Sequence, residues 1–369
     1  MAYENIKEII KNFEFVGEFD SIEELTAGNI NNTYKLNFKV ADGNMNMYVL
    51  QRINTNVFKN PVGLMNNVKL VTEHIAAAMK EQGIYSNRRV LTFIPAKNGT
   101  WLYEDAEGGF WRADIFIDNA TAHNFISDPK HFYESGRGFG EFQKYLFDFP
   151  AEQLVETIPN FHNTKARFFD FVNSVKEDPA GRVKEVEAEI DFLFDRRKMM
   201  TKIVDLIDEG KLPLRVTHND TKLNNVMIDD ESGKAICVID LDTVMPGSVL
   251  YDYGDAIRFG ANTAAEDEED TSKIALNMDL FKLFTDGFVE EIAGVLTPDE
   301  IHYLPLGAMV MTCELVLRFL KDYIDGDVYF KVKRPGHNLI RARAQMKLLE
   351  EMEKHYDEMV EYVDSLIKK

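Results

Sequence analysis

The chain has 369 residues, of which 45% are hydrophobic and 11% aromatic, so it is long enough for one large domain or two lobes around a substantial core. Its 42 basic and 62 acidic residues give a formal charge of −20, which argues against nucleic acids and anionic membranes as partners because their phosphates would be repelled over most of the surface. Its two cysteines, Cys237 and Cys313, lie in apolar runs and are expected to be buried thiols in a reducing compartment.

The chain carries no recognisable signal for export or for a membrane span. Its first fifteen residues alternate in charge and lack the continuous apolar run of a signal peptide. The most apolar stretch, from Leu304 to Leu320, is interrupted by Glu314 and Arg318 and falls short of a membrane span. We therefore expect a cytoplasmic protein without membrane partners, and we favour a monomer.

The first third of the chain has the pattern of a small β-sheet with accompanying helices. Helices are expected over 5–15 and 61–79, and strands over 47–53, 89–93 and 110–117. Gly28 and Asn29 form a turn signal between two strand-like runs. The turn is either a surface hairpin or a loop that covers the phosphates of a nucleotide with its backbone N–H groups. In the second case Gly28, Asn31 and Thr33 are the predicted nucleotide contacts.

The pattern changes from β to α at Ile117–Asn119. We place a lobe boundary here, which divides the chain into an N-terminal lobe of residues 1–118 and a C-terminal lobe of residues 119–369. A segment that crosses between two lobes can offer free backbone N–H and C=O groups to the edge of an adenine ring. Ile117 and Asn119 are therefore predicted nucleotide contacts.

A cluster of glycines within the helical pattern of 129–147 could be mistaken for a nucleotide-binding loop. Gly136, Gly138 and Gly140 follow the pattern G-x-G-x-G rather than G-x-G-x-x-G, and they lie inside a helical periodicity rather than between a strand and a helix. We interpret them as small residues that let two helices pack closely.

The segment Leu304–Ile324 is apolar on nearly every side, which predicts a buried helix. Glu314, Arg318 and Asp322 recur at intervals of four residues and so form one polar stripe on this helix. Because unpaired buried charge is costly, the stripe is either an internally satisfied ion network or the wall of a polar pocket.

The stretch that says most about chemistry runs from Val216 to Arg258. A short β-like run delivers His218-Asn219-Asp220 into a loop, Asn225 follows five residues after Asp220, and a second apolar run delivers Asp240. One Asp can orient and deprotonate a hydroxyl, while an Asn and a second Asp can hold Mg²⁺ against the phosphates of a nucleotide. The spacing predicts the catalytic loop and the metal-binding strand of a kinase-like phosphotransferase.

Other chemistries fit this stretch less well. The chain has no G-x-x-x-x-G-K-[ST], H-E-x-x-H, C-x-x-C or G-x-S-x-G sequence, which argues against a P-loop, a zinc site and an α/β-hydrolase. It also lacks the D-F-G and A-P-E sequences of a protein kinase. A glycosidase that uses Asp220, Asp240 and Asp242 stays formally open, but it gives Asn225 no role.

The motif resembles the H-x-D-x-x-x-x-N and I-D signature of the aminoglycoside phosphotransferase and choline kinase superfamily. Several stretches are similar to bacterial N-acetylhexosamine 1-kinases: GNINNTY, YVLQRIN, THNDTKLNN, IDLDTVMPG, YDYGDAIRFGANTAAEDE, LRFLKDYIDGDVYF and RPGHNLIRAR. The resemblance runs from Thr26 to Leu348. It implies a bilobal, protein-kinase-like α+β fold, with a small antiparallel N-terminal sheet and a mostly helical C-terminal lobe. It also implies transfer of the ATP γ-phosphoryl, with Mg²⁺, to the anomeric 1-hydroxyl of N-acetylglucosamine or N-acetylgalactosamine.

Roles in the reaction follow for individual residues. Asp220 is the expected catalytic base, and Lys222 is expected to neutralise charge on the transferring phosphoryl. Asn225 and Asp240 are expected to hold Mg²⁺. The remaining assignments are sugar contacts from Asp242, Arg318, Tyr329 and Asn29, and loop support from His218 and Asp252. With Arg318 as a sugar contact, the pocket wall is the favoured interpretation of the polar stripe.

One expected residue is missing. Kinase-like folds carry a Lys at the end of the strand that corresponds to 47–53, where it holds the α- and β-phosphates, but here Gln51 and Arg52 occupy that neighbourhood. Arg52 is the predicted substitute, with a solvent-facing arginine as the alternative. The alternative function is a kinase of another small alcohol, such as an aminoglycoside, choline, ethanolamine or homoserine. A catalytically silent binding protein is disfavoured, because all the catalytic and metal positions are present.

Overall fold

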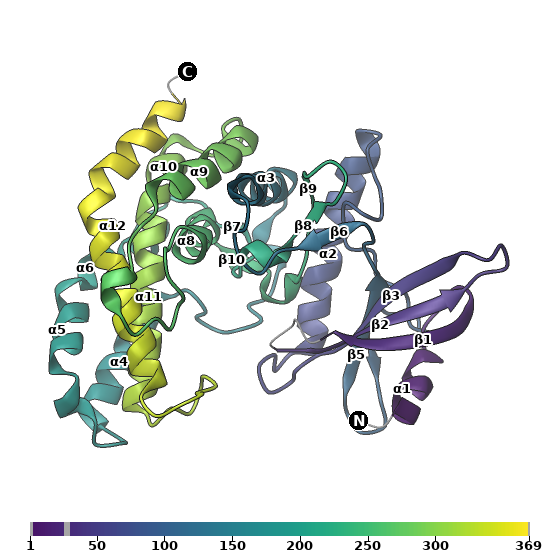
Figure 1. The fold of residues 1–369 in the computed structure, drawn as a ribbon, viewed down its shortest axis with the longest axis horizontal. Helices are drawn as coiled ribbons and strands as arrows, with labels where there is room; N and C mark the ends of the chain where they lie inside the picture. Colours follow the sequence, from purple (N-terminus) through teal and green to yellow (C-terminus); the bar gives the residue numbers. More distant parts are fainter. Residues whose placement is uncertain (1–2, 26–29, 368–369) are drawn as a thin grey trace.

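The computed structural model describes residues 3–25 and 30–367 and has two unequal parts, a β-sheet near the N-terminus and a larger helical body (Figure 1). The first part contains α1 (Tyr3–Ile10), β1 (Glu18–Leu25), β2 (Asn32–Lys39), β3 (Met45–Arg52), α2 (Pro61–Glu81), β4 (Tyr103–Glu104) and β5 (Phe110–Ile115). The second contains β6 (Ala120–Ala122), α3 (Pro129–Tyr145), α4 (Thr164–Glu177), α5 (Glu187–Asp195), α6 (Arg197–Met200), α7 (Lys202–Asp208), β7 (Arg215–Thr217), β8 (Val226–Asp229), β9 (Ala235–Val238), β10 (Met245–Gly247), α8 (Val249–Gly260), α9 (Met278–Ile292), α10 (Pro298–His302), α11 (Leu304–Ile324) and α12 (His337–Ile367). The predicted α+β class is confirmed.

The N-terminal sheet is antiparallel throughout, with the strand order β1-β2-β3-β5-β4. Its core packs with α1 and includes Leu36, Leu50 and Trp111. The strand predicted over 89–93 does not form, because this segment meets β5 only through a single bridge from Phe93 to Asp114.

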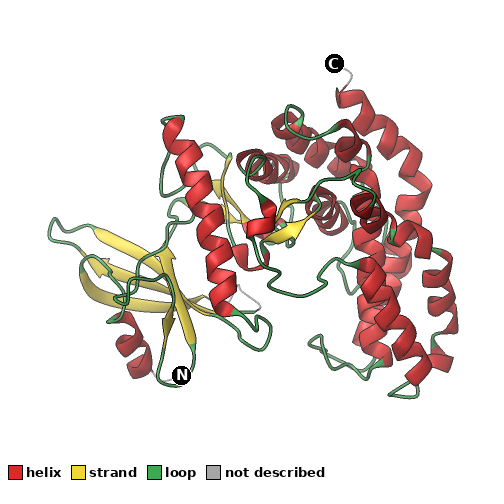
Figure 2. Ribbon diagram, turned by 180° about the vertical axis from the view of Figure 1, so that it is seen from behind, coloured by secondary structure: helices red, strands yellow, loops and turns green. Residues whose placement is uncertain are grey.

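Helix α2 stands between the sheet and the helical body, as both views show (Figures 1 and 2). It begins with Pro61, and the side chain of Asn60 accepts a hydrogen bond from the Gly63 N–H, which stabilises the first turn. Val68 of α2 shares a hydrophobic core with Phe142 of α3. The core therefore crosses the boundary at residue 118, and that boundary stays a prediction.

Two close helix crossings organise the helical body. A Cβ added to Gly136 of α3 would lie 2.3 Å from the carbonyl oxygen of Phe284 in α9. A Cβ added to Gly254 of α8 would lie 2.3 Å from the carbonyl oxygen of Gly307 in α11. Only glycine permits such approaches, because any side chain would overlap the facing backbone. A Cβ added to Gly140 would likewise lie 2.8 Å from the carbonyl oxygen of Phe288 in α9, so the interpretation as helix-packing residues is confirmed for Gly136 and Gly140, whereas Gly138 faces Val226 and Ala235.

Helix α11 lies against α4, α8 and α12, and nearly all of its side chains are buried, as its apolar sequence predicts. Cys237 and Cys313 are buried free thiols, which confirms that prediction as well. Among residues 3–25 and 30–367, no helix has the length and apolarity needed to cross a membrane.

Short strands carry the segment that the sequence singles out for chemistry. β7 pairs with β10, while β6, β8 and β9 form a small antiparallel sheet. Residues 218–225 form the loop between β7 and β8, and Asp240 comes directly after β9 and Ile239. The two predicted apolar runs are thus strands that bring this loop and Asp240 together.

Candidate active site

The loop between β7 and β8 holds the carboxylate of Asp220 between two polar side chains. Lys222 Nζ lies 2.6 Å from Asp220 Oδ1, and Asn225 Nδ2 donates to Asp220 Oδ2 at 3.1 Å. Burial works against the charge of Lys222, but Asp220 and Asp255 raise its pKa, so the side chain stays an ammonium. Both oxygens of Asp220 are therefore oriented before any substrate binds.

The buried carboxylate of Asp252 holds the backbone of this loop. It accepts hydrogen bonds from the backbone N–H groups of His218 at 2.9 Å and Asn219 at 2.8 Å, and from Gln143 Nε2 at 2.7 Å. Asn219 has a φ of 65°, a left-handed conformation that Asn tolerates better than most residues. Burial raises the pKa of Asp252 to about 6, although these donors favour the ionised form. The geometry is the one that the predicted supporting role requires.

His218 joins the same loop to the strand that precedes Asp240. Its Nε2 lies 2.9 Å from the carbonyl oxygen of Ile239, and the Asp220 N–H approaches its Nδ1 at 3.3 Å. A carbonyl can only accept, so Nε2 carries the proton and Nδ1 accepts. The imidazole thus couples the positions of Asp220 and Asp240.

Asp240 and Asn225 have the chemistry of a Mg²⁺ site. The side-chain hydrogen bonds of Asn225 within the described chain use its Nδ2, which leaves its Oδ1 for a cation. Asp240 is solvent-exposed, and no hydrogen bond to its carboxylate is found among the described residues. Desolvation of the carboxylate by the surrounding protein, followed by repulsion from the carboxylates of Asp242 and Asp220, raises its pKa to about 7. A divalent cation would relieve this repulsion.

These two oxygen donors do not form a complete metal cage. In residues 3–25 and 30–367, no group of three His, Cys, Asp or Glu side chains could hold a metal ion by itself. Mg²⁺ commonly binds through one or two protein oxygens and completes its shell with water and substrate phosphates. The residues present therefore fit a metal ion that arrives with a nucleotide.

Asp242 is buried and has both carboxylate oxygens engaged. Its Oδ1 lies 2.5 Å from Arg112 Nη1, with both side chains at most 4% exposed, and its Oδ2 accepts a hydrogen bond of 2.6 Å from Asn31 Nδ2. Asn31 also accepts the backbone N–H of Asn54 at 2.9 Å, so it ties the end of β3 to the helical body. The predicted sugar contact of Asp242 thus falls on a carboxylate that already has two partners.

Gln51 and Arg52, where a β3 lysine is expected, face opposite sides of the sheet. Gln51 pairs with Arg112 of β5, and its side chain bonds both Arg112 and Thr33. Arg52 pairs with Trp111, whose ring lies 5.9 Å from its guanidinium carbon. Because neighbours on a strand face opposite sides, Arg52 faces away from Thr33 and Arg112. Arg52 thus lies on the opposite face of the sheet from Gln51, and its role as the lysine substitute stays a prediction.

The crossing segment offers one residue with free backbone groups. In the described part of the chain, neither the N–H nor the C=O of Ile117 has a hydrogen-bond partner. The carbonyl oxygen of Asn119 accepts hydrogen bonds from Arg88 Nη2 at 3.0 Å and from the Asp230 N–H at 3.0 Å. Of the two predicted adenine contacts, Ile117 is therefore the one with unused backbone groups. The predicted contacts Gly28 and Asn29 lie outside the described residues.

The polar stripe of α11 meets a cluster of cations at its centre. The fully buried Glu314 lies 3.0 Å from His162 Nδ1, 3.5 Å from Arg167 Nε and 3.6 Å from Arg318 Nη1. Burial opposes its ionisation, but His162 and the two arginines lower its pKa. The guanidinium of Arg318 also lies 5.3 Å and 5.5 Å from the rings of Phe161 and Phe330.

Asp322, at the C-terminal end of the same stripe, anchors a loop. Asp322 accepts backbone N–H groups from Val328, Tyr329 and Phe330 at distances of 2.8 to 3.0 Å. This arrangement fixes the backbone of Tyr329 while its side chain stays exposed. An ion network therefore describes Glu314 and a loop anchor describes Asp322, while the pocket wall with Arg318 stays a prediction.

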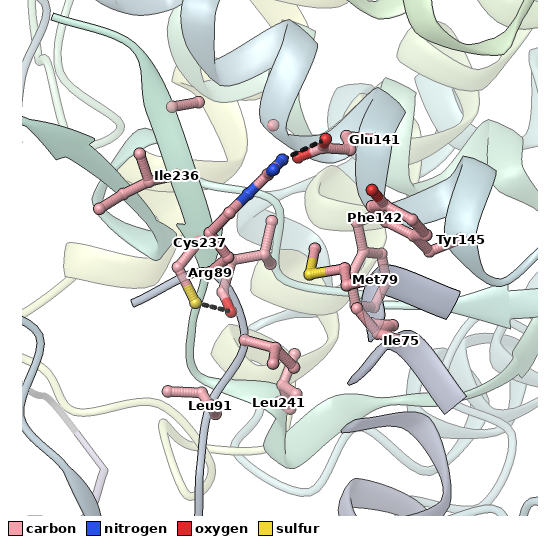
Figure 3. A pocket seen from close by; sticks show the side chains of 14 residues that line it. Ile75, Met79, Arg89, Leu91, Glu141, Phe142, Tyr145, Ile236, Cys237 and Leu241 are labelled. Carbon is pink, nitrogen blue, oxygen red and sulfur yellow. Dashed lines mark hydrogen bonds and ion pairs between the residues drawn. The ribbon is translucent and has the colours of Figure 1, made fainter. Parts of the chain in front are cut away.

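A separate pocket lies between α2, α3 and β9 (Figure 3). Its lining includes Ile75 and Met79 of α2, Phe142 of α3 and Cys237 of β9, and the ion pair of Arg89 with Glu141 borders it at 2.6 Å. None of the predicted site residues lines it. Its apolar walls fit a packing defect behind β9 better than a site for a phosphorylated ligand.

Three further polar residues around the candidate site were not predicted from the sequence. Arg112 and Asp114 lie on β5, and burial and Asp242 raise the pKa of Asp114 to about 7, although Arg112 lowers it. The third is His162, between α3 and α4. One signal was present, because two opposite charges spaced by two residues in the strand Phe110–Ile115 lie on one face of an otherwise apolar strand. No local signal marks His162.

Comparison with known proteins bears on the fold and on the family of the chain. Three solved structures resemble the chain over most of its length, at identities that establish only a shared fold. They are a microcompartment-associated aminopropanol kinase (13% identity, TM-score 0.61, 97% of this chain and 98% of that one), an amicoumacin kinase in complex with AMP-PNP and Ca²⁺ (11%, 0.59, 95% and 94%), and a choline/ethanolamine kinase family protein from Mesorhizobium loti (14%, 0.55, 94% and 93%). A family model described as the phosphotransferase enzyme family matches residues 21–276. The chain belongs to this family and is a small-molecule phosphotransferase of the aminoglycoside phosphotransferase and choline kinase type.

Proposed function

We propose that the protein is a kinase that transfers the γ-phosphoryl of ATP to the anomeric 1-hydroxyl of an N-acetylhexosamine, with Mg²⁺ as the metal. The observation that carries the proposal is the oriented carboxylate of Asp220, held between Lys222 and Asn225 beside the exposed Asp240. Phosphoryl transfer needs little covalent chemistry from the protein, so positioning and charge neutralisation are the main tasks of such a site.

Asp220 accepts the proton of the attacking hydroxyl while the oxygen forms its bond to phosphorus and the bond to the ADP oxygen breaks. Lys222 keeps the carboxylate oriented and brings a positive charge to the transferring group. Mg²⁺, when bound by Asp240 and Asn225, supplies neutralisation of the phosphate charge. An anomeric hydroxyl is more acidic than an ordinary alcohol, so a carboxylate suffices as the base.

The charges around Arg318 favour a neutral acceptor over a cationic one. Arg167 and Arg318 share the single carboxylate of Glu314, so this cluster carries a surplus of positive charge. Guanidinium groups donate hydrogen bonds to hydroxyl and carbonyl oxygens, which an N-acetylhexosamine has in abundance. A polycationic aminoglycoside or a choline would meet repulsion here.

The cluster is linked electrostatically to the catalytic loop. Burial works against ionisation of Asp255 in α8, but Arg258, Lys222 and His162 lower its pKa. One buried carboxylate therefore lies within electrostatic reach both of Lys222 in the loop and of His162 beside Glu314. This supports a single acceptor site bounded by Asp220 on one side and Arg318 on the other. The resemblance of LRFLKDYIDGDVYF to N-acetylhexosamine 1-kinases supports the same assignment.

The test is a panel of sugars and amino alcohols offered with ATP and Mg²⁺. We expect ADP release with N-acetylglucosamine or N-acetylgalactosamine, and a phosphate on C1 by ³¹P NMR. ADP release with an aminoglycoside, choline, ethanolamine or homoserine instead would establish the alternative function, a kinase of another small alcohol.

A variant separates the acceptor site from the nucleotide site. We expect Arg318→Gln to raise the KM for the sugar by about tenfold or more, because hydrogen bonds to a charged group are lost, while the KM for ATP stays unchanged. Lys198→Gln, which changes an exposed cation on α6, is the matched control. Equal sugar KM values in the two variants would remove Arg318 from the acceptor site.

A further inference from the structure

The cation expected to face the nucleotide phosphates is absent from β3. A chain with a formal charge of −20 repels phosphate over most of its surface, so a nucleotide site needs a local positive charge. The helix that would carry a glutamate partner for a β3 lysine is α2, yet its Glu73 is exposed and only 3.9 Å from Lys69. The lysine and its usual counter-ion are thus both missing from their usual places.

Strand register places another cation, Arg112, beside Gln51, where a β3 lysine is expected. Thr33 of β2 pairs with Gln51 of β3, and Gln51 pairs with Arg112 of β5. Residues paired across antiparallel strands face the same side of a sheet, so these three side chains form one row. Two hydrogen bonds connect the row, from Gln51 Nε2 to Thr33 Oγ1 at 3.2 Å and from Arg112 Nε to Gln51 Oε1 at 3.0 Å. Thr33 belongs to the turn that is predicted to cover the nucleotide.

The bonding of Arg112 is incomplete. It is buried, and its Nη1 lies 2.5 Å from Asp242 Oδ1 and 3.7 Å from the thioether of Met65. Nη1 is thus committed to Asp242, and Nε donates to Gln51. No hydrogen bond from Arg112 Nη2 is found among the described residues. Nη2 is also not one of the buried polar atoms that lack a partner, so it keeps contact with solvent and can donate to an incoming acceptor.

The acidic neighbours of Arg112 are the ones that a metal-bound nucleotide would approach. Burial opposes its charge, but the carboxylates of Asp242, Asp240 and Asp114 raise its pKa, so it is a permanent cation. Asp240 is the predicted metal ligand, two residues before Asp242 in the chain. Arg112 therefore joins the row on the sheet to the metal-binding strand.

We propose that Arg112 is the phosphate-binding cation of the nucleotide site, moved from β3 to β5, with Gln51 as its spacer and Asp242 as its counter-ion. The proposal rests on the nucleotide use proposed above. Arg112 Nη2 donates to an α- or β-phosphate oxygen, and Asp242 holds the guanidinium in place as a helix glutamate holds a β3 lysine. The catalytic loop keeps its own cation, Lys222, for the transferring group.

The test measures ADP binding by calorimetry, in EDTA and in Mg²⁺, on the full chain. Arg112→Gln alone leaves Asp242 as a buried, unpaired carboxylate, so the first variant combines Arg112→Gln with Asp242→Asn. We expect it to fold and to bind ADP about 10- to 100-fold more weakly, the usual effect of losing a hydrogen bond between charged groups. Arg196→Gln with Glu353→Gln removes an ion pair between α5 and α12 and is expected to leave ADP affinity unchanged.

A second variant moves the cation back to β3. Gln51→Lys with Arg112→Gln keeps Asp242 as the counter-ion and is expected to recover most of the ADP affinity. Wild-type ADP affinity in Arg112→Gln with Asp242→Asn would show that Arg112 is only structural and would overturn the proposal. A failure of the second variant to bind ADP better than the first would also count against it. If the wild-type protein bound no ADP, the proposed nucleotide use itself would fail, which is a distinguishable result.

Discussion

The candidate site has a catalytic side and a sheet side, which are built by different means. The catalytic side draws its groups from a short stretch, 216–252. Hydrogen bonds within that stretch hold these groups, above all those that the His218 and Asn219 backbone N–H groups donate to the Asp252 carboxylate. The sheet side draws its groups from the consecutive strands β2 and β3 and from β5, which comes much later in the chain, and cross-strand pairing places Gln51 beside Arg112. One side depends on spacing along the sequence and the other on register between strands.

Backbone strain follows the same division. Asn219 and Asp240 both adopt positive φ angles, of 65° and 61°, within the catalytic stretch. Such conformations persist only where surrounding contacts enforce them, and they concentrate at functional sites. Among the described residues of β2, β3 and β5 no residue has a positive φ. The catalytic side therefore needs the support of Asp252, whereas the sheet side is held by regular ladders.

The largest expected effect is on the chemical step. Asp220→Asn should lower kcat by about 10²- to 10⁴-fold, because the base that accepts the hydroxyl proton is lost. The ADP affinity measured by calorimetry should change little, since Arg112, the residue proposed to bind the nucleotide phosphates, belongs to the sheet side. Turnover that persists at the wild-type rate would remove Asp220 as the base, and a large loss of ADP affinity would mean that the two sides are not separable.

The next largest effect is on stability. Asp252→Ala should lower the free energy of unfolding by about 3 kcal/mol or more, because two buried backbone N–H groups and the Gln143 amide lose their acceptor. Urea denaturation measures the free energy of unfolding of each variant. Asp191→Ala on the exposed face of α5 should stay within about 0.5 kcal/mol of wild type. Equal stabilities of the two variants would contradict the supporting role of Asp252.

A smaller effect concerns the contact that joins the two sides. Asn31→Ala removes the hydrogen bonds to Asp242 and to the Asn54 N–H. We expect ADP to bind about fivefold more weakly, since a net loss of about 1 kcal/mol is typical of one such hydrogen bond. Asn32→Ala, at the exposed neighbouring residue, serves as the control. A weaker effect from Asn31→Ala than from Asn32→Ala would break the proposed link between turn and Asp242.

The smallest effect is a pH dependence at Asp240. Its pKa of about 7 in the folded protein lies above the ordinary value of 3.8, so the folded state binds an extra proton between these two values. The free energy of unfolding therefore falls as pH rises through this window. In EDTA, Asp240→Asn should raise Tm relative to wild type at pH 8, and this gain should vanish near pH 4. A gain that is equal at both pH values would contradict the raised pKa.

The predictions from sequence succeeded to different degrees on the two sides. His218, Asp220, Lys222, Asn225 and Asp240 come together in one place, as their spacing between two short strands indicated. On the sheet side the absence of a β3 lysine was visible in the sequence. Arg112 was not found, because a strand pattern does not say which residue of the next strand lies opposite. Nothing local marked His162, whose contact with Glu314 joins residues 152 positions apart.

The sequence by itself determined the family, the α+β class, the buried α11 and the order of groups along the catalytic loop. These depend on short spacings and on apolar periodicity, which are local properties of a chain. Tertiary structure alone decided that Gln51, not Arg52, shares a face of the sheet with Arg112, and that Asp242 is the counter-ion of that arginine. Both depend on strand register and on the meeting of β5 with the end of β9, and such long-range pairings leave no mark in either segment taken alone.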